Sequence, residues 1–271
     1  MNTVREPAVA GMFYPGSPSK LKDQIKILLE LTKSDVEYKN PVAIVTPHAG
    51  YIYSGKTAAY AFNSLRGKQY KTVVIISPSH REYFPGISIY NGDAYKTPLG
   101  IIPLNKEMIS KLTAGSKIIF EGIQGHRNEH AVEVQIPFLQ MVMNEFSIIP
   151  VVIGDQRKEF IDELALKLSK VIDDETLIVA SSDLSHFYTK EQAAALDSLV
   201  EKRISEFDYE NLQSDLDSNK CEACGGGAIV AAMKTAGLLN KKSAKVLSRS
   251  DSGDTTGENS EVVGYLSAVI Y

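Results

Sequence analysis

The sequence predicts an α/β fold, a three-layer α/β/α single domain in which a mostly parallel central sheet lies between two layers of helices. Two observations support this prediction. Apolar runs of strand length, rich in Val and Ile, alternate with amphipathic segments of helical period over most of the chain. No stretch rich in Pro, Gly and Ser is long enough to separate two units, so residues 1–271 are expected to form one domain.

The first half of the chain is expected to begin with an extended arm. A helix over residues 18–32 is predicted because Leu21, Ile25, Leu28 and Leu29 recur at intervals that place them on one face. The elements that follow are a strand, an Ala-rich helix, a second strand, a hairpin that turns at Asn91-Gly92, a helix and a short strand, over residues 42–46, 54–65, 72–77, 84–103, 105–113 and 117–120.

The second half continues the same alternation. A helix is predicted over residues 129–144, where Val132, Ile136 and Leu139 share one face and Asn128 is available as the N-cap. The remaining elements are a strand, a strongly amphipathic helix, a strand, three helices and two closing strands, over residues 147–153, 155–172, 176–180, 191–203, 209–214, 222–235, 245–250 and 262–270.

The composition is that of an ordinary globular protein, and it argues against several classes of function. The chain has 271 residues, of which 44% are hydrophobic and 23% are charged. A net charge of −4 and the absence of a basic cluster argue against nucleic-acid binding. No apolar stretch has the length of a membrane span, and no signal-peptide pattern is visible. Two cysteines are too few for a disulfide scaffold, so we expect a cytoplasmic protein.

Three of the five histidines follow apolar runs of strand length. They are His48 in VAIVTPHAG, His80 in TVVIISPSH and His186 in LIVASSDLSH. Because the carboxyl ends of neighbouring parallel strands meet at one edge of an open sheet, these imidazoles are expected to converge. A lone loop histidine more often bonds to the backbone, but three at strand ends predict a shared polar site that holds a metal. His48 and His80 are the first candidates for ligands.

The other two histidines, His126 and His130, lie four residues apart in HRNEH. On one helix they could chelate a metal, but the helix is expected to begin near Asn128, which leaves His126 in the preceding loop as an exposed residue. His130 falls in the first helical turn. There the positive end of the helix dipole favours a neutral imidazole, which can accept a proton or bind substrate.

Asp183 precedes His186 by three residues in the segment ASSDLSH. An Asp that orients a nearby His is typical of general-base catalysis, or of a group that supports a metal ligand. A Ser-His-Asp triad is an alternative because serines surround these motifs, yet no G-x-S-x-G turn accompanies them. A purely structural alternative is an N-cap role for Asp183, with His186 packed on it.

The segment CEACGGG contains one C-x-x-C pair, Cys221 and Cys224, without a second pair for a four-cysteine zinc site. Cys224 lies at the N-terminus of a predicted helix, where a thiolate is stabilised and its pKa lowered, so it is a candidate third ligand. A small residue packed at a crowded helix start is the alternative, and nothing assigns a role to Cys221. The acidic segment SDSGDTTGE lacks the spacing of an EF-hand and is expected to be a solvated turn.

Several motifs together resemble the Memo family, whose archaeal and bacterial members are also called AmmeMemoRadiSam system protein B. They are, in order, VREPAVAGMFYPGSP, TPHAGYIYSG, ISPSH, NEHAVEVQIPFLQ, SSDLSHF and ACGGGAI, and they span nearly the whole chain. The resemblance implies a fold like that of class III extradiol dioxygenases of the LigB type, which bind Fe(II) with two histidines and a carboxylate. The Memo family has a cysteine at the position of the carboxylate. Residues that match the metal ligands are His48, His80 and Cys224, and those that match polar residues of the same cleft are His186, Asp183 and His130.

The resemblance implies a metal-dependent redox protein with Fe(II) as the expected metal. Cu and Zn are alternatives, because a thiolate suits softer metals than a carboxylate does. In this hypothesis His186, oriented by Asp183, removes a proton from a small phenolic substrate, and His130 donates to the developing anion. The alternatives are a ligand- or peptide-binding module of the phosphotyrosine type and a metal-handling protein. The family name implies AMMECR1-like and radical-SAM partner proteins, and neither nucleic acid nor a membrane is an expected partner.

Overall fold

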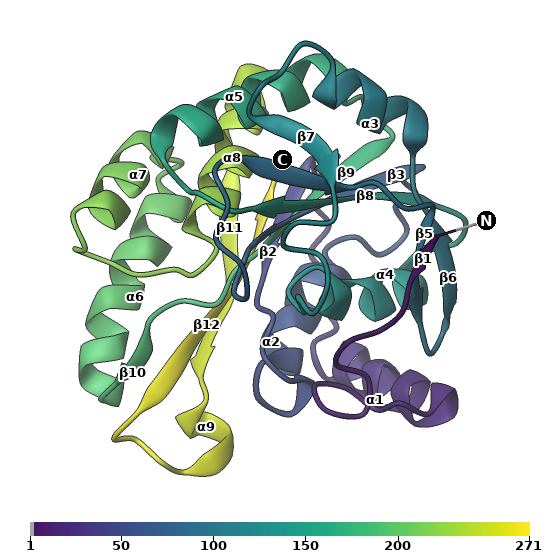
Figure 1. Cartoon of the computed structure of the whole chain (residues 1–271). Helices are drawn as coiled ribbons and strands as arrows, with labels where there is room; N and C mark the ends of the chain where they lie inside the picture. Colours follow the sequence, from purple (N-terminus) through teal and green to yellow (C-terminus); the bar gives the residue numbers. More distant parts are fainter. Residues whose placement is uncertain (1–2) are drawn as a thin grey trace.

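A mixed sheet of nine strands forms the centre of the computed structural model, which describes residues 3–271 (Figure 1). Its strands are β2 (Ala43–Thr46), β3 (Thr72–Pro78), β4 (Ile87–Tyr90), β7 (Ile119–Gly122), β8 (Ser147–Ile153), β9 (Thr176–Ser181), β10 (His186–Tyr188), β11 (Ala244–Asp251) and β12 (Val262–Ile270). Their order is β10-β12-β2-β9-β3-β8-β4-β7, and β11 pairs with β12 outside this path.

The middle of the sheet is parallel. β2 pairs with β9, β9 with β3 and β3 with β8, all in the same direction, whereas β12 and β4 run antiparallel to β2 and β8. Every residue of β3 is buried, as expected for a Val- and Ile-rich strand that is covered on both faces. The predicted α/β fold with parallel central strands is confirmed, and the antiparallel strands at its sides make the complete sheet mixed.

Helices cover both faces of the sheet. They are α1 (Pro18–Leu31), α2 (Tyr51–Asn63), α3 (Lys106–Thr113), α4 (Ile136–Val142), α5 (Lys158–Val171), α6 (Lys190–Ser205), α7 (Tyr209–Asp217), α8 (Gly226–Leu238) and α9 (Gly253–Thr256), with a 3-10 helix over Glu133–Gln135. One side holds α1, α2 and α4, and the other holds α5, α7 and α8 (Figure 1). Leu21, Ile25 and Leu29 of α1 are buried, as their spacing predicts. Among the described residues, no helix is both long and apolar enough to cross a membrane.

A small second sheet corrects one prediction. β5 (Ala94–Thr97) and β6 (Gly100–Pro103) form an antiparallel hairpin, and β1 (Val4–Arg5) adds a parallel strand to β5. The expected hairpin with a turn at Asn91-Gly92 is wrong, because β4 pairs with β7 and β8 in the central sheet instead of with β5. All four residues of β4 are buried, so this apolar strand belongs inside the large sheet.

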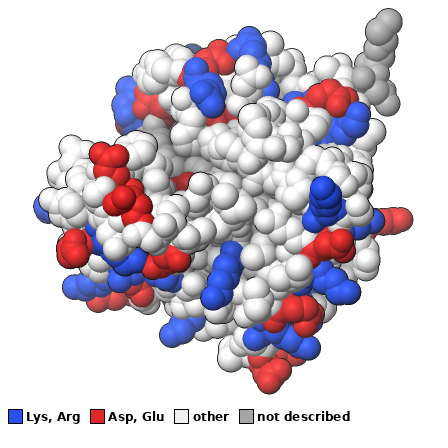
Figure 2. Space-filling view, turned by 90° about the horizontal axis from the view of Figure 1, so that it is seen from below, with Lys and Arg blue, Asp and Glu red and all other residues white. Residues whose placement is uncertain are grey.

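The carboxyl end of β2 lies in the lower half of the molecule as drawn in Figure 1, because β12 rises from the side of α9 and runs antiparallel to β2. Seen from that side in Figure 2, the surface is hollowed near its centre, and most charged side chains lie around the periphery. At this edge β2, β3 and β9 lead into three of the histidine motifs.

Candidate metal centre

Three neighbouring strands deliver polar residues to one edge of the sheet. β2 ends at Thr46, two residues before His48, and β3 ends at Pro78, two residues before His80. β9 lies between these strands and leads into Asp183. The strand order β2-β9-β3 therefore places the three motifs side by side, as expected for the carboxyl ends of parallel strands.

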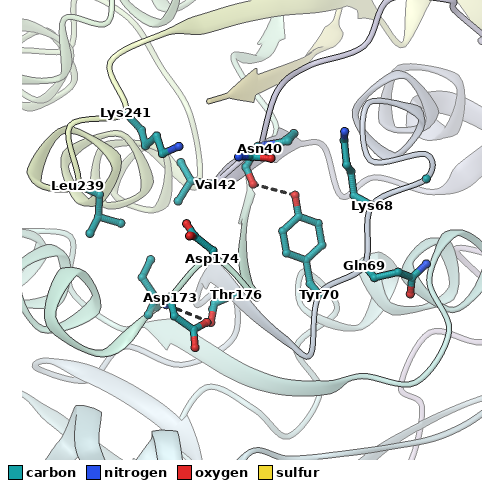
Figure 3. A pocket seen from close by; sticks show the side chains of 13 residues that line it. Asn40, Val42, Lys68, Gln69, Tyr70, Asp173, Asp174, Thr176, Leu239 and Lys241 are labelled. Atoms are coloured by element: carbon teal, nitrogen blue, oxygen red, sulfur yellow. Dashed lines mark hydrogen bonds between the residues drawn. The ribbon is translucent and has the colours of Figure 1, made fainter.

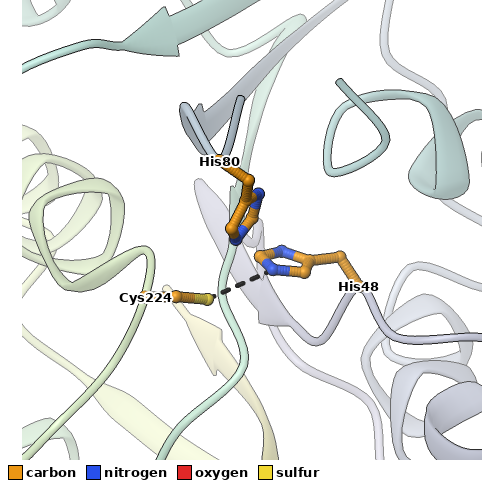
Figure 4. Close-up of side chains that lie close together, drawn as sticks. All are labelled: His48, His80 and Cys224. Atoms are coloured by element: carbon orange, nitrogen blue, oxygen red, sulfur yellow. Dashed lines mark hydrogen bonds between the residues drawn. The ribbon is translucent and has the colours of Figure 1, made fainter. Parts of the chain in front are cut away.

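His48, His80 and Cys224 come together at this edge (Figure 4). One ligand atom from each side chain, an imidazole nitrogen or the thiol sulfur, lies within 4.8 Å of the other two. Sγ of Cys224 is 3.2 Å from Nε2 of His48, and the rings of His48 and His80 have centroids 5.0 Å apart. Two imidazoles and a thiol form a donor set that suits borderline and soft metals, such as Fe(II), Cu and Zn.

The hydrogen bond of Nδ1 leaves Nε2 of His48 facing the Cys224 sulfur as a candidate metal ligand. The Ser181 hydroxyl donates to the carbonyl oxygen of Ala131 and accepts from the Gln135 amide, so its other lone pair accepts Nδ1–H of His48 at 2.9 Å. The neutral ring then carries no proton on Nε2. Burial and the neighbouring His80 lower the pKa of His48 to about 3, which keeps the ring neutral at physiological pH.

Glu129 holds His80 in the corresponding tautomer. Its carboxylate accepts the His80 backbone N–H at 2.6 Å and the ring Nδ1–H at 2.9 Å. An ionised carboxylate has no proton to donate, so Nδ1 is the donor, and Nε2 is the ring nitrogen that is left for a metal. Burial raises the pKa of Glu129, but the bonds from His80 outweigh burial and lower it to about 2. In Figure 4 one ring nitrogen of His80 points toward His48 and Cys224.

The Cys224 thiol holds its proton in the metal-free protein, so the prediction of a stabilised thiolate is wrong. Burial and the nearby Asp183 carboxylate raise the pKa of the thiol well above its ordinary value. Cys224 lies two residues before α8, and its Sγ accepts the backbone N–H of Asp183 at 3.2 Å. A metal bound here would replace the thiol proton as the positive partner of the sulfur.

His130 lies in irregular backbone just before a turn at residues 131–132, where a helix over residues 129–144 was expected. Only the later part of this stretch is helical, as the 3-10 helix and α4. Pro137 lacks an N–H for a helical bond, and the Glu129 carboxylate accepts the backbone N–H groups of His130 and Ala131 in place of helical carbonyls. The argument from a helix dipole at His130 is therefore wrong.

His130 nevertheless joins the candidate centre. Its ring stacks on that of His80 with centroids 4.8 Å apart, and its centroid is 5.4 Å from that of His48. Burial and the neighbouring His48 lower the pKa of His130 to about 4, so the ring is neutral at physiological pH. With His80 and Glu129, His130 also forms a second group of possible ligands whose atoms lie within 4.8 Å of one another.

The N-terminal arm fixes the segment around Glu129. Arg5 is buried and donates to the carbonyl oxygens of His126 and Glu129, and its Nη1 lies 2.5 Å from the Glu133 carboxylate. Glu133 also accepts the Tyr14 hydroxyl at 2.6 Å and two backbone N–H groups of the arm. A buried ion pair with so many further hydrogen bonds holds the arm and this segment in one arrangement.

His186 and Asp183 lie near the centre but contact other partners than predicted. Nδ1–H of His186 donates to the carbonyl oxygen of Leu184 at 2.7 Å. Oδ1 of Asp183 accepts the backbone N–H of His48 at 2.7 Å, and Oδ2 is 3.9 Å from Nε2 of His48. The prediction that Asp183 orients His186 is therefore wrong, because the carboxylate holds His48 instead. Burial raises the pKa of Asp183.

His126 and Cys221 belong to the core. His126 was expected to be exposed, but it is buried, with Nε2–H donating to the carbonyl oxygen of Ser88 at 3.2 Å and Nδ1 accepting from the Tyr95 hydroxyl at 2.8 Å. Burial lowers the pKa of His126 to about 3. Cys221 is buried as well, and burial raises the pKa of its thiol to about 11. Within residues 3–271, neither belongs to a group of possible metal ligands.

A cavity of about 540 Å³, here called the site cavity, opens beside the candidate centre. It is lined by Met12, Phe13, Ala49, Gly50, Ile52, Tyr53, His130, Asp183, His186, Ser252, Thr256, Glu258, Glu261, Val263 and Tyr265. This volume suits a small organic ligand. His186 also lines a second cavity, of about 350 Å³, which reaches Cys221 and Cys224.

A separate cavity of about 470 Å³ lies at the amino ends of the same strands (Figure 3). Among its lining residues, Val42 immediately precedes β2 and Thr176 begins β9. Several of its polar groups bond to their neighbours, since the Thr176 hydroxyl donates to Asp173 at 2.7 Å and the Tyr70 hydroxyl donates to the carbonyl oxygen of Pro41 at 2.8 Å. The histidine motifs lie at the opposite ends of the strands, so this cavity is not part of the candidate centre.

Comparison with known proteins identifies the family. The family described as Memo-like protein matches residues 5–269. The chain belongs to the Memo family. It is 37% identical to a MEMO1 family protein of Thermoplasma volcanium over 98% of both chains, and 34% identical to one of Methanocaldococcus jannaschii over 100% of both. A MEMO1 family protein of a Thermotoga species is also 34% identical, over 98% of this chain and 99% of that protein. The predicted family is confirmed.

The fold of this Memo family protein is similar to a solved structure. The crystal structure of an uncharacterized protein from Escherichia coli K12 matches it with a TM-score of 0.55, over 84% of this chain and 99% of that one. The sequences are 14% identical, so the likeness concerns the fold alone. It supports the α/β fold class that the sequence predicts.

Sequence reasoning missed three residues that support the candidate ligands. Glu129 bonds to His80, Ser181 bonds to His48, and Gln135 donates to the Ser181 hydroxyl. All three are buried polar residues. A signal was present, because a Glu or Gln inside an otherwise apolar segment, as in AVEVQIPF, must find a buried partner. The sequence does not say which partner that is.

Proposed function

We propose that this Memo family protein is a metal-dependent redox protein whose metal is bound by His48, His80 and Cys224. The observation that carries the proposal is the convergence of two imidazoles and one thiol within 4.8 Å. Each imidazole has its Nδ1 engaged in a hydrogen bond, which leaves Nε2 available. Neutral imidazoles and a thiol that gives up its proton are the forms in which these side chains bind metals.

Fe(II) is the metal that we propose, with Cu or Zn as alternatives. The resemblance to class III extradiol dioxygenases favours iron, because those enzymes bind Fe(II) with two histidines and a carboxylate. Cys224 makes this donor set softer than theirs, and softer donors also suit copper and zinc. Bound iron or copper would supply redox chemistry and a positive charge that attracts an oxygen-bearing ligand.

His186, His130 and Asp183 are the residues that we propose to act on a small phenolic ligand in the site cavity. All three line that cavity. The Nδ1–H of His186 donates to a carbonyl oxygen, so Nε2 is the ring nitrogen that we propose to accept the phenolic proton. Neutral His130 can donate one hydrogen bond to the anion that results. Asp183 acts indirectly, because its carboxylate accepts the backbone N–H of His48 and so holds that ligand in position.

Elemental analysis of protein purified without a metal-affinity tag tests the ligand set. Wild-type protein should contain about one iron, copper or zinc per chain, and His48→Ala and Cys224→Ala should contain little. Cys221→Ala is the matched control, because it removes a buried thiol that lies outside both groups of possible ligands. Wild-type protein that is free of metal and fails to bind added Fe(II), Cu(I) or Zn(II) would refute the proposal.

A ligand-binding module without turnover is the second candidate, and the site cavity favours it. Met12, Ile52 and Tyr53 line the cavity and remain exposed, so part of its wall is free to contact a ligand or peptide. Such a module would bind its ligand equally well after chelation of the metal. Titration of one ligand into native and chelated protein separates the two functions, because only metal-dependent binding is lost.

Two further proposals rest on the family resemblance alone. A metal-handling protein would contain metal and turn over none of the phenols offered to it. Association with AMMECR1-like and radical-SAM proteins is tested by copurification of those proteins with this chain from a host that contains all three. Recovery of this chain alone, under conditions that preserve weak complexes, would count against the association.

A further inference from the structure

We infer that the site cavity selects ligands that carry a positive charge on an aromatic body. This inference rests on the proposed function, since it names the class of ligand for the same site. The inference follows from the charge of one wall of the cavity and from the other side chains that line the cavity.

Residues 251–261, here called the acidic wall, close one side of the site cavity. Four of them line it, among them Glu258 and Glu261. Oε1 of Glu258 accepts the backbone N–H groups of Ser260 and Asn259, at 2.9 Å each, and these bonds lower the pKa of its carboxyl group. The segment over residues 250–258, which the sequence predicts to be only a solvated turn, contains α9 and forms part of the cavity wall.

The acidic groups of the wall outnumber the basic groups that pair with them. Lys190 pairs with both Asp251 and Asp254, at 3.0 Å and 2.5 Å, so two carboxylates share its single charge. Within residues 3–271, no Lys or Arg forms an ion pair with Glu258 or Glu261. None of the described residues that line the cavity is Lys or Arg. The cavity therefore presents negative charge to its ligand.

The remainder of the lining suits an aromatic body. Phe13, Tyr53 and Tyr265 contribute rings, and Met12 and Ile52 contribute apolar side chains. Aromatic faces stack on aromatic ligands and also attract organic cations. A ring with a short side chain fits well within about 540 Å³.

A carboxylate or phosphate on the ligand would be repelled in this cavity. It would approach Glu258 and Glu261 without a Lys or Arg in the lining to offset the repulsion. The wall therefore favours an aromatic amine over an aromatic acid, and it disfavours the phosphotyrosine-type ligand of the alternative function.

Three catechols with the same ring and different side-chain charge test the inference. Dopamine is cationic, propylcatechol is neutral and dihydrocaffeate is anionic. Calorimetric titration into the metal-loaded protein at low ionic strength should rank them in that order. The affinities of the first and the last should differ by about thirtyfold, for two carboxylates that act at about 8 Å through a water-like dielectric on ligands of opposite charge. Salt at about 0.5 M should reduce the difference to less than about threefold.

A double variant tests whether the acidic wall causes the difference in affinity among the three catechols. Glu258→Gln combined with Glu261→Gln should abolish the ranking, so that the three catechols bind with similar affinities. Glu107→Gln removes an exposed carboxylate on α3, outside the cavity lining, and should preserve the ranking. Equal affinities for the three catechols in the wild type, or a preference for the acid, would overturn the inference while leaving the proposed function intact.

A failure of all three catechols to bind would instead refute the phenolic part of the proposed function. The same titration with phenethylamine and phenylpropionate, which lack the hydroxyl groups, then tests the inference. A preference for the amine that is lost in the double variant supports it. Equal binding of the two, or no binding of either, overturns it.

Discussion

Replacing Glu129 by Gln should weaken metal binding as well as the fold. The Glu129 carboxylate accepts two N–H groups of His80 and one each from His130 and Ala131, at 2.6–3.0 Å. Gln has the same shape but one acceptor oxygen in place of two. When that oxygen keeps the bond to Nδ1–H of His80, the new NH₂ group faces the backbone N–H of His80, and this donor loses its partner.

Two magnitudes follow from this geometry. A buried donor without a partner costs about 1–3 kcal/mol, so Glu129→Gln should lower the free energy of unfolding by that amount. The variant also removes the negative charge behind His80, which makes Nε2 of that ring a poorer ligand. Changes of this kind lower metal affinity by about 10–100-fold.

Competition titration against a chromophoric chelator measures the metal affinity, and urea denaturation of metal-free protein measures stability. Glu133→Gln is the matched control, because Glu133 is also a buried carboxylate but bonds to Arg5 and Tyr14 instead of an imidazole. The control should lose stability and keep its metal affinity. The reasoning is refuted if Glu129→Gln binds metal as tightly as the wild type, or if Glu133→Gln weakens binding as much.

Three further predictions follow from other buried groups. Arg5→Met breaks a buried ion pair and should cost about 3–5 kcal/mol in urea denaturation; a cost below about 1 kcal/mol would contradict this. His126 has its pKa lowered to about 3, so its contribution to stability is complete above an unfolded-state pKa of about 6.5 and is lost as the pH falls toward 3. Metal-free protein should therefore lose about 2 kcal/mol through this residue between pH 7 and pH 5, and His126→Gln should flatten the slope; parallel slopes would disprove it. Gly225→Ala would bring a Cβ into overlap with the carbonyl oxygen of Ser181 and should lower the metal content, whereas Gly16→Ala, with its nearest neighbour at 3.5 Å, should not; equal metal content in both variants would count against this.

The positions of His48 and His80 are predictable from the sequence because strands and their ends leave a local signal. Runs of Val and Ile mark β2 and β3, and parallel strands bring their carboxyl ends together. The role of Cys224 as a ligand is harder to predict from strand ends. A lone C-x-x-C pair has several interpretations, and the family resemblance selects the second cysteine as the ligand.

The irregular backbone at His130 and the partner of Asp183 are not predictable in this way, because side chains decide both. The helical spacing of Val132, Ile136 and Leu139 is real, but bonds from Glu129 satisfy the backbone before a helix can begin. Asp183 lies closer in sequence to His186 than to His48. The pairing of β2 with β9 nevertheless places its carboxylate against the backbone of His48. Neither the backbone conformation at His130 nor the partner of Asp183 can therefore be predicted from the local sequence.

The wide separation of the candidate ligands along the chain has a consequence for biosynthesis. His48 and Cys224 are 176 residues apart, and the last strand, β12, pairs with β2. On the ribosome both imidazoles emerge long before the sulfur, and contacts between distant segments form late in folding. A nascent chain therefore cannot assemble all three ligands until Cys224 has left the ribosome, and any metal bound by the full set marks a polypeptide that has been synthesised beyond that residue.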